Sequence, residues 1–239
     1  LYLYNIKKNY NKKRNNMFNM FYSSAKDMKD LCDQLVQKGY LNDKRVYNAM
    51  IKTDRADFSP NNPYVDTPQP IKYNVTISAP LIHAYCLGLL KDHLFEGAKA
   101  LDVGFGSGYL TVAMSEMVGN KGCVVGIEHI KKFCDFDKTP INQHHKDKLD
   151  NKNIILVEGD GRQGYKSMAP YNCIHVGAAA PKIPEELITQ LALGGRLVIP
   201  VGEQNQDQYI YIIDKDKNGK VTKRREMGVI FVPLTSVEK

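Results

Sequence analysis

The sequence predicts an α/β fold, in which a doubly wound, mostly parallel sheet carries helices on both faces. Two observations lead to this prediction. From Ala98 onward, short apolar stretches alternate with stretches of helical periodicity, which is the pattern of β-α-β units. Near the C-terminus two β-rich stretches instead flank Asn218-Gly219, a strong signal for a hairpin turn.

The N-terminal part is predicted to add helices to this sheet. Met28, Leu31 and Leu35 recur at helical spacing, and the apolar pattern predicts helices over 24–38 and 43–52. A third helix is predicted over 79–91, with Ser78 as its N-cap. Between them, residues 53–74 contain four prolines and form a long loop, and long ordered loops often line sites.

The core elements follow in order. Five strands are predicted over 99–103, 123–127, 154–158, 172–176 and 196–201. The helices between them are predicted near 108–118, after 129, near 162–167 and over 184–192, the last stopped by Gly194-Gly195. With the two hairpin strands this makes a Rossmann-like, seven-stranded sheet with an antiparallel C-terminal edge.

The basic charge is concentrated at the N-terminus. The chain has 239 residues and a formal net charge of +7, and five positive charges with no acid fall in residues 1–22. The rest of the chain therefore carries only +2. We expect 1–22 to be a disordered leader rather than a nucleic-acid-binding arm, and 23–239 to be a single domain.

Cysteine usage and hydropathy indicate the compartment. No apolar stretch approaches about 20 residues, so no membrane span is predicted. The cysteines are scattered without a C-x-x-C pair, which argues against disulfides or a zinc site and fits the cytoplasm. His144-His145 lies in a polar stretch, 131–153, that we interpret as a solvated insertion rather than a metal site.

The stretch LDVGFGSGYLTVA is the first functional signal. A P-loop requires Lys after its last glycine, and here Tyr109 follows Gly108. The dinucleotide fingerprint G-x-G-x-x-G is also not matched, because Gly104, Gly106 and Gly108 alternate. Asp102 precedes this loop, and a carboxylate there repels a pyrophosphate but can pair with an ammonium group. The pattern therefore favours S-adenosyl-L-methionine.

Two further acids end neighbouring predicted strands. Glu128 follows Gly108 by 20 residues, where a carboxylate can accept hydrogen bonds from ribose hydroxyls. Asp160 ends the third strand and could accept from the adenine amino group. Because ligands of open α/β sheets bind at the carboxyl ends of strands, we expect these acids to line one pocket with Asp102. Taken singly, each acid could equally be a loop residue that caps a helix.

The sequence indicates the acceptor of the methyl group less directly than it indicates the cofactor. The stretch NNPYVD at 61–66 resembles a segment of amino-methylating enzymes but precedes the glycine loop. After the fourth strand stands GAAAP, at 177–181, which supplies no acid or base. Small side chains with exposed backbone would let a peptide main chain lie close and form hydrogen bonds. A carboxylate nucleophile is already ionised and needs no base, so the stretch suits a carboxylate acceptor better than an amine.

Several motifs in the same order resemble the protein-L-isoaspartate O-methyltransferase family, over roughly residues 24–239. They are VTISAP at 75–80, EGAKALDVGFGSGYLT at 96–111, GIEHI at 126–130, GDGRQGY at 159–165, APYNCIHVGAAAP at 169–181, LALGGRLVIPVG at 191–202 and MGVIFVPLT at 227–235. The combination of TISAP with HVGAAAP is the most specific part of this resemblance.

The resemblance implies an activity. The family transfers a methyl group from S-adenosyl-L-methionine to the α-carboxylate of L-isoaspartyl residues in damaged proteins and peptides, leaving S-adenosyl-L-homocysteine. The ester then closes to a succinimide, which starts repair. We expect a monomer without nucleic-acid or membrane partners. Its domain would comprise N-terminal helices and a cofactor-covering loop over 23–95 and a Rossmann-like core over 96–239.

The resemblance also implies residue roles. Ser78 matches the active-site hydroxyl, and Ala178, Ala179 and Ala180 match the wall that faces the peptide substrate; no metal is implied. The residues that match cofactor contacts are Tyr73, Asn74, Val75, Thr76, Ile77, Ser78, His83, Asp102, Gly104, Ser107, Gly108, Glu128, His129, Asp160, Gly161 and Thr235. Glu128 stands where the family often has Asp, and either carboxylate can hold a ribose.

Three other functions remain open from the sequence. The chain could methylate a small carboxylic acid or an amine, and esterification of isoaspartyl but not aspartyl peptides would separate these. It could be a silent S-adenosylmethionine-binding module, which would bind ligand without turnover. A NAD-dependent dehydrogenase is a third alternative, which stabilisation by S-adenosylhomocysteine but not NADH would exclude.

Overall fold

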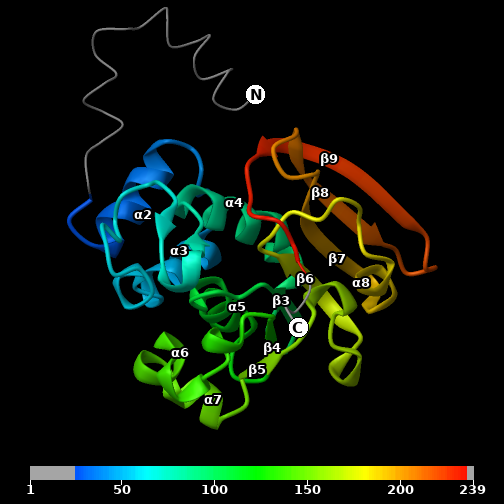
Figure 1. Ribbon diagram of the computed structural model, residues 1–239, viewed down its shortest axis with the longest axis horizontal. Helices are drawn as coiled ribbons and strands as arrows, with labels where there is room; N and C mark the ends of the chain where they lie inside the picture. Colours follow the sequence, from blue (N-terminus) through cyan, green and yellow to red (C-terminus); the bar gives the residue numbers. More distant parts are fainter. Residues whose placement is uncertain (1–24, 236–239) are drawn as a thin grey trace, which may run out of the picture.

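A seven-stranded sheet forms the centre of the computed structural model, which describes residues 25–235 (Figure 1). The strands are β3 (Lys99–Val103), β4 (Cys123–Glu128), β5 (Ile154–Glu158), β6 (Tyr171–Val176), β7 (Leu191–Val201), β8 (Gln208–Lys215) and β9 (Val221–Val229). Their order is β5-β4-β3-β6-β7-β8-β9, and only β7-β8 and β8-β9 pair antiparallel. The predicted doubly wound sheet with an antiparallel edge is confirmed. The predicted leader, 1–22, lies outside the described residues.

Alternate residues of each central strand pack into two separate apolar cores. Ala100 and Cys173 belong to the core beneath the N-terminal helices, whereas Leu101 and Ile174 belong to the core on the opposite face. This is the period-two pattern of strands buried on both faces. The helices of the first face are α2 (Met28–Gln37), α3 (Lys44–Lys52), α4 (Pro80–Leu90) and α5 (Tyr109–Val118). Within residues 25–235, the helical elements on the second face are α8 (Glu185–Thr189) and short 3₁₀ turns.

The first two helices begin where aspartates can cap them, so both predicted helices are confirmed. The Asp27 carboxylate accepts a hydrogen bond from the backbone N–H of Asp30, and Asp43 accepts from those of Arg45 and Val46. Such caps satisfy N–H groups that have no partner within the helix. The α2 helix packs on α3, and α3 packs on α5 and α4.

The prediction that Ser78 caps α4 is wrong. The N-cap is Ala79, without a side-chain cap bond, and the Asp66 carboxylate accepts from the Leu81 N–H at 2.8 Å. The long segment 53–74 brings Asp66 to this helix. It also contributes Gln69–Pro70 (β1), which pairs antiparallel with Thr76–Ile77 (β2), so it is more ordered than a loop.

Two predicted helices of the second half are also corrected. The stretch 162–167 holds only the 3₁₀ turns Gly161–Gln163 and Lys166–Met168. The helix predicted over 184–192 ends at Thr189, and β7 begins at Leu191 and runs through Gly194-Gly195. A side chain at Gly195 would meet backbone oxygens of Tyr171, Asn172 and Ala192 at 2.9–3.1 Å. Gly195 thus lets β7 approach β6 closely, whereas Gly194, with a φ of 79°, adopts the left-handed conformation within the strand.

The segment 131–153 is a packed part of the domain rather than a solvated insertion. It forms 3₁₀ turns and the helices α6 (Pro140–His144) and α7 (Lys146–Asp150). Ile141 is fully buried, and Lys148 pairs with Glu116 of α5 at 2.5 Å. Although most residues of the stretch are polar, Ile141 and Lys148 pack it against α5 and the glycine that precedes α5.

The predicted C-terminal hairpin is confirmed. Strands β8 and β9 pair across a turn that contains Gly219, whose φ of 83° is the left-handed conformation that glycine favours. All five cysteines are unbonded thiols. Among residues 25–235, no helix combines the length and hydrophobicity that a membrane crossing requires.

Candidate active site

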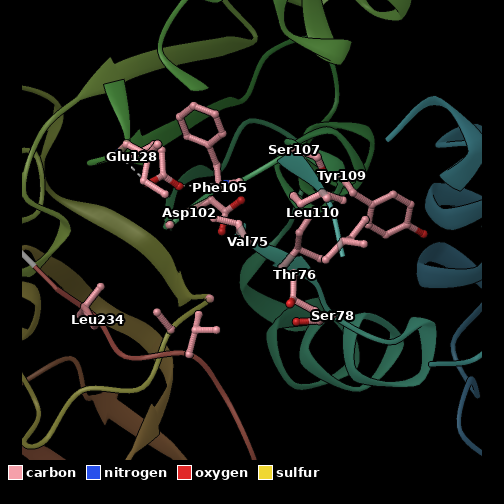
Figure 2. A pocket seen from close by; sticks show the side chains of 18 of the residues that line it. Val75, Thr76, Ser78, Asp102, Phe105, Ser107, Tyr109, Leu110, Glu128 and Leu234 are labelled. Carbon is pink, nitrogen blue, oxygen red and sulfur yellow. Dashed lines mark hydrogen bonds between the residues drawn. The ribbon is translucent and has the colours of Figure 1, made fainter. Parts of the chain in front are cut away.

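One pocket opens at the carboxyl ends of β3, β4 and β6 (Figure 2). The chain runs from β3 outward to β4 and β5 and then returns to place β6 on the other side of β3. Such a switch point leaves a crevice where ligands of open α/β sheets bind. The pocket holds about 750 Å³ of space between atoms, counting the solvent in its open mouth.

The glycine loop forms the floor of this pocket, and its glycines serve different purposes. Gly104 has a φ of 74°, and a Cβ there would meet no atom within 4 Å. Gly108 has a φ of 91°, and a Cβ there would lie 2.4 Å from Ile141 Cδ1. Gly104 therefore leaves room for a ligand next to the backbone, whereas Gly108 allows α6 to pack against the start of α5.

Asp102 is buried at the centre of a polar network. Its Oδ1 accepts a hydrogen bond from His175 Nδ1 at 2.8 Å, and its Oδ2 accepts from Thr111 Oγ1 at 2.6 Å. Asp102 and His175 are register partners on adjacent strands, so their side chains lie side by side. Burial lowers the pKa of His175, but its hydrogen bonds with Asp102 and Cys86 outweigh this effect and raise that pKa to about 10. Asp102 and His175 thus form a buried ion pair.

Glu128 organises the loop that follows β4. Its Oε1 accepts from the backbone N–H groups of His129 and Ile130 at 2.8 and 3.0 Å, and its Oε2 accepts from Gly106 at 3.1 Å. His129 Nδ1 lies 2.9 Å from the same Oε1, and its Nε2 lies 3.2 Å from Thr235 Oγ1. A carboxylate can accept about four hydrogen bonds, so Glu128 Oε2 can still accept from a ligand.

Ser78 lies at the other side of the pocket from Glu128 (Figure 2). It follows β2 directly, and its backbone carbonyl accepts a hydrogen bond from Arg55 Nη2 at 2.8 Å. Among the described residues, none is hydrogen-bonded to the Ser78 hydroxyl. The hydroxyl is therefore available to a ligand, and the structure removes the competing role of helix cap.

Most residues predicted for the site line this pocket. These are Val75, Thr76, Ile77, Ser78, His83, Asp102, Gly104, Ser107, Glu128, His129, Ala178 and Thr235. Asn74 lies in the turn that leads into β2. The lining does not include Tyr73, Gly108, Asp160, Gly161, Ala179 or Ala180. Each residue of this last group has another structural role.

Tyr73, Asp160 and Gly161 make other contacts. The Tyr73 ring packs edge-on against Phe133, with the ring centroids 5.0 Å apart. The Asp160 carboxylate accepts from Arg162 Nε and Nη2, which lowers the pKa of Asp160. A Cβ at Gly161 would lie 2.3 Å from Val103 Cγ1, so this glycine is required for close packing.

The alanine stretch is a wall joined to the C-terminal segment. The Ala179 N–H donates to the Val232 carbonyl at 2.8 Å, and the Leu234 N–H donates back to Ala179 at 2.8 Å. The Ala180 N–H donates to Pro200 at 3.0 Å. The backbone that we expected to be exposed for a peptide is thus paired within the chain at Ala179 and Ala180. Ala178 is the member of the three that lines the pocket.

Sequence reasoning missed two polar residues near the pocket. His175 could have been found, because it occupies in the fourth core strand the position that Asp102 occupies in the first. Arg55 had no signal in the sequence, since the loop that carries it has no periodicity. Within the described residues, no group of three or more His, Cys, Asp or Glu could hold a metal ion.

Comparisons with known proteins agree with this architecture. A family model described as protein-L-isoaspartate(D-aspartate) O-methyltransferase matches residues 26–239. A protein-L-isoaspartate O-methyltransferase of Caenorhabditis elegans is 49% identical over 217 residues, which cover 91% of this chain and 96% of that protein. A protein-L-isoaspartate O-methyltransferase 1 of Arabidopsis thaliana is 45% identical over 90% of this chain and 94% of its own length.

A solved structure extends the comparison to the cofactor. It is a Plasmodium falciparum protein, assigned as a protein-L-isoaspartate O-methyltransferase and crystallised in complex with S-adenosyl-L-homocysteine. It superimposes with a TM-score of 0.81 at 36% identity, covering 87% of this chain and 98% of that one. The resemblance drawn from the sequence motifs is confirmed, and the chain belongs to the protein-L-isoaspartate(D-aspartate) O-methyltransferase family.

Proposed function

We propose that this chain transfers a methyl group from S-adenosyl-L-methionine to the α-carboxylate of L-isoaspartyl residues in proteins and peptides. The observation that carries the proposal is that Ser78, Asp102 and Glu128, from three separate segments, line one pocket at the switch point of the sheet. Family membership and the S-adenosyl-L-homocysteine complex of the Plasmodium falciparum relative support the choice of cofactor. The methyl ester would then close to a succinimide, which starts repair.

The residues of the pocket fit this cofactor. The open space beside Gly104 would accept an atom group where a side chain would otherwise stand. Asp102 and Glu128 each keep acceptor capacity beyond their present hydrogen bonds, for an ammonium group and for hydroxyls respectively. The cofactor supplies a methyl group on a sulfonium, which is an excellent leaving group.

The chain's own residues then have to align the acceptor and exclude water. The free Ser78 hydroxyl can donate to one oxygen of a substrate carboxylate and so orient the other. Val75, Leu110 and Leu234 are apolar parts of the pocket lining and restrict water there. No base is needed, because a carboxylate is already ionised at neutral pH.

The test is methyl transfer on matched peptides. The full chain is incubated with radiolabelled S-adenosyl-L-methionine and two peptides that differ only in an L-isoaspartyl or an L-aspartyl residue. We expect label to enter the isoaspartyl peptide as a base-labile ester and not to enter the aspartyl peptide. Equal labelling of both peptides, or labelling of neither while S-adenosyl-L-homocysteine binds, contradicts the proposal.

We further propose that the protein is a cytoplasmic monomer without nucleic-acid partners, organised as one methyltransferase domain over 23–239. Five unbonded cysteines support a reducing compartment, and a charge of only +2 outside residues 1–22 argues against nucleic-acid binding. The packing of α3 and α4 against α5 and β7 supports one domain in which 23–95 covers the core of 96–239. Light scattering coupled to gel filtration tests the monomer, and a mass twice that of the chain contradicts it.

A further inference from the structure

A fully buried arginine lies behind the wall of the pocket. Arg55, in the 3₁₀ turn Arg55–Asp57, has no exposed surface. Its Nη2 donates to the Ser78 carbonyl at 2.8 Å, and its Nη1 lies 3.3 Å from His83 Nδ1. No carboxylate among residues 25–235 is within ion-pair distance of it, and its Nε has no hydrogen-bond partner there.

A buried arginine without an ion-pair partner lowers the stability of the fold, so stability does not explain its presence. A buried charge is normally paired, because removing it from water carries a penalty of several kcal/mol. Burial lowers the pKa of Arg55 to about 10, so the guanidinium remains a cation at neutral pH. The guanidinium lies over the Tyr109 ring, 5.6 Å from its centroid, and the charge of Asp66 raises the pKa of Arg55 against the effect of burial. With no described carboxylate at ion-pair distance, Arg55 still places a positive charge behind Ser78, which favours an anion at this side of the pocket.

The contact with His83 determines which ring nitrogen carries the proton. A guanidinium can only donate hydrogen bonds, so His83 Nδ1 must be the acceptor. Burial, followed by the charges of Arg55 and His175, lowers the pKa of His83 well below its usual value, so the ring is neutral. A neutral ring with Nδ1 unprotonated carries its proton on Nε2. The ring lines the pocket and lies against Tyr109, with the ring centroids 4.7 Å apart.

We propose that Arg55 is a positioning residue, which holds the Ser78 backbone and fixes His83 in the tautomer that offers an Nε2–H donor to a bound carboxylate. The identification of that carboxylate rests on the proposed function. It belongs either to the isoaspartyl residue or to the methionine part of the cofactor, and the two have the same chemistry. Arg55 itself does not line the pocket, so it acts through Ser78 and His83.

The first experiment reads the tautomer directly and does not depend on turnover. The ring nitrogens of the full chain are labelled with ¹⁵N, and the His83 signal is assigned by its loss in His83→Asn. We expect an unprotonated Nδ1 and a protonated Nε2 in the wild type, and a shift toward the other tautomer in Arg55→Met. A protonated Nδ1 in the wild type, or an unchanged tautomer in Arg55→Met, overturns the proposal.

The second experiment measures the functional consequence in the same variants. Arg55→Met should raise either the Kd for S-adenosyl-L-homocysteine or the KM for an isoaspartyl peptide by about 10- to 100-fold. This is the effect of losing a hydrogen bond to a charged group. A change in the first locates the carboxylate in the cofactor, and a change in the second locates it in the peptide. Wild-type values for both overturn the positioning role even if the tautomer changes.

Two more variants keep the test independent of folding. Arg45 also donates to backbone carbonyls, those of Lys91, Leu94 and Met117, but away from the pocket. Arg45→Met should lower thermal stability and leave the tautomer, the binding constant and KM unchanged. Arg55→Lys keeps a buried cation and replaces Arg55→Met if the latter does not fold. We expect it to raise the same quantity, either the Kd for S-adenosyl-L-homocysteine or the KM for the peptide, by a smaller factor. Wild-type values of both again overturn the proposal. An inactive wild type with the expected tautomer would contradict the proposed function alone.

Discussion

The two sides of the pocket are built in opposite ways. On the side of the glycine loop, Asp102 and Glu128 are carboxylates that end strands and are held by His175, Thr111 and backbone N–H groups. On the side of Ser78, the nearest buried charge is the cation of Arg55, which reaches the site from a loop. Because His175 balances the charge of Asp102, the first side offers carboxylate oxygens as hydrogen-bond acceptors for ammonium and hydroxyl groups, whereas the second side suits an anion.

The difference matches the two charges that the proposed reaction brings together. The donor carries ammonium and sulfonium groups, and the acceptor is a carboxylate. Acceptor oxygens on one side and a buried cation on the other orient two such ligands before any chemistry occurs, because preorganised polar groups in a site with little water act strongly. The carboxylate side is buried within the sheet, whereas the Ser78 side depends on contacts made by residues 53–78.

The largest effect is expected from breaking the carboxylate side with Asp102→Ala. The change leaves His175 buried without its ionic partner, and removing one member of a buried pair costs about 3–5 kcal/mol. Urea unfolding measures the loss. Asp150→Ala is the control, because Asp150 forms an exposed pair with Lys146 that is worth at most about 0.5 kcal/mol. Equal losses in both variants would mean that burial of the Asp102–His175 pair has no energetic consequence.

The same pair should make stability depend on pH in a defined direction. The pKa of His175 is raised from 6.5 to about 10, so the folded protein holds this proton more tightly than the unfolded chain. The contribution is fully present below pH 6.5 and is lost as the pH rises toward about 10. We expect the difference in unfolding free energy between wild type and His175→Gln to shrink over that interval. A difference that stays constant with pH would show that His175 is not charged in the folded state.

On the Ser78 side, Ser78→Ala should reduce kcat by about 10- to 100-fold, the value of one hydrogen bond to a charged group. Because no described residue hydrogen-bonds to the hydroxyl, thermal stability should stay at the wild-type value, and S-adenosyl-L-homocysteine affinity should change less than kcat. Single-turnover kinetics and calorimetry provide these measurements. A loss of thermal stability with unchanged kcat would mean that Ser78 caps α4 after all.

The smallest effect is expected from the residue that does cap α4. Asp66→Ala removes the acceptor of the Leu81 N–H and should cost about 0.5–2 kcal/mol of unfolding free energy. Because the cap lies just beyond Ser78, we also expect kcat to fall by less than in Ser78→Ala. Thermal unfolding and kinetics on the same preparation test this ranking. A larger kcat effect than that of Ser78→Ala would place Asp66 in the site itself.

The sequence determined the features that depend on neighbours along the chain. The five core strands, the hairpin at Gly219 and the glycine loop follow from local periodicity and turn chemistry, and all are present. Asp102 and Glu128 also lie where expected, because the carboxyl ends of adjacent parallel strands meet at one edge of the sheet. The prediction that a helix ends at Gly194-Gly195 is wrong. The two glycines lie within β7, because pairing with β6 makes this region a strand.

Only the tertiary structure decided how the charges are partnered. The His175 partner of Asp102, the Asp66 cap of α4 and the hold of Arg55 on Ser78 join residues 15 to 73 positions apart. The first follows from strand register, and the other two follow from the path of residues 53–78. A buried polar group takes whichever partner the packed chain brings within hydrogen-bond reach, and composition and spacing do not encode that proximity.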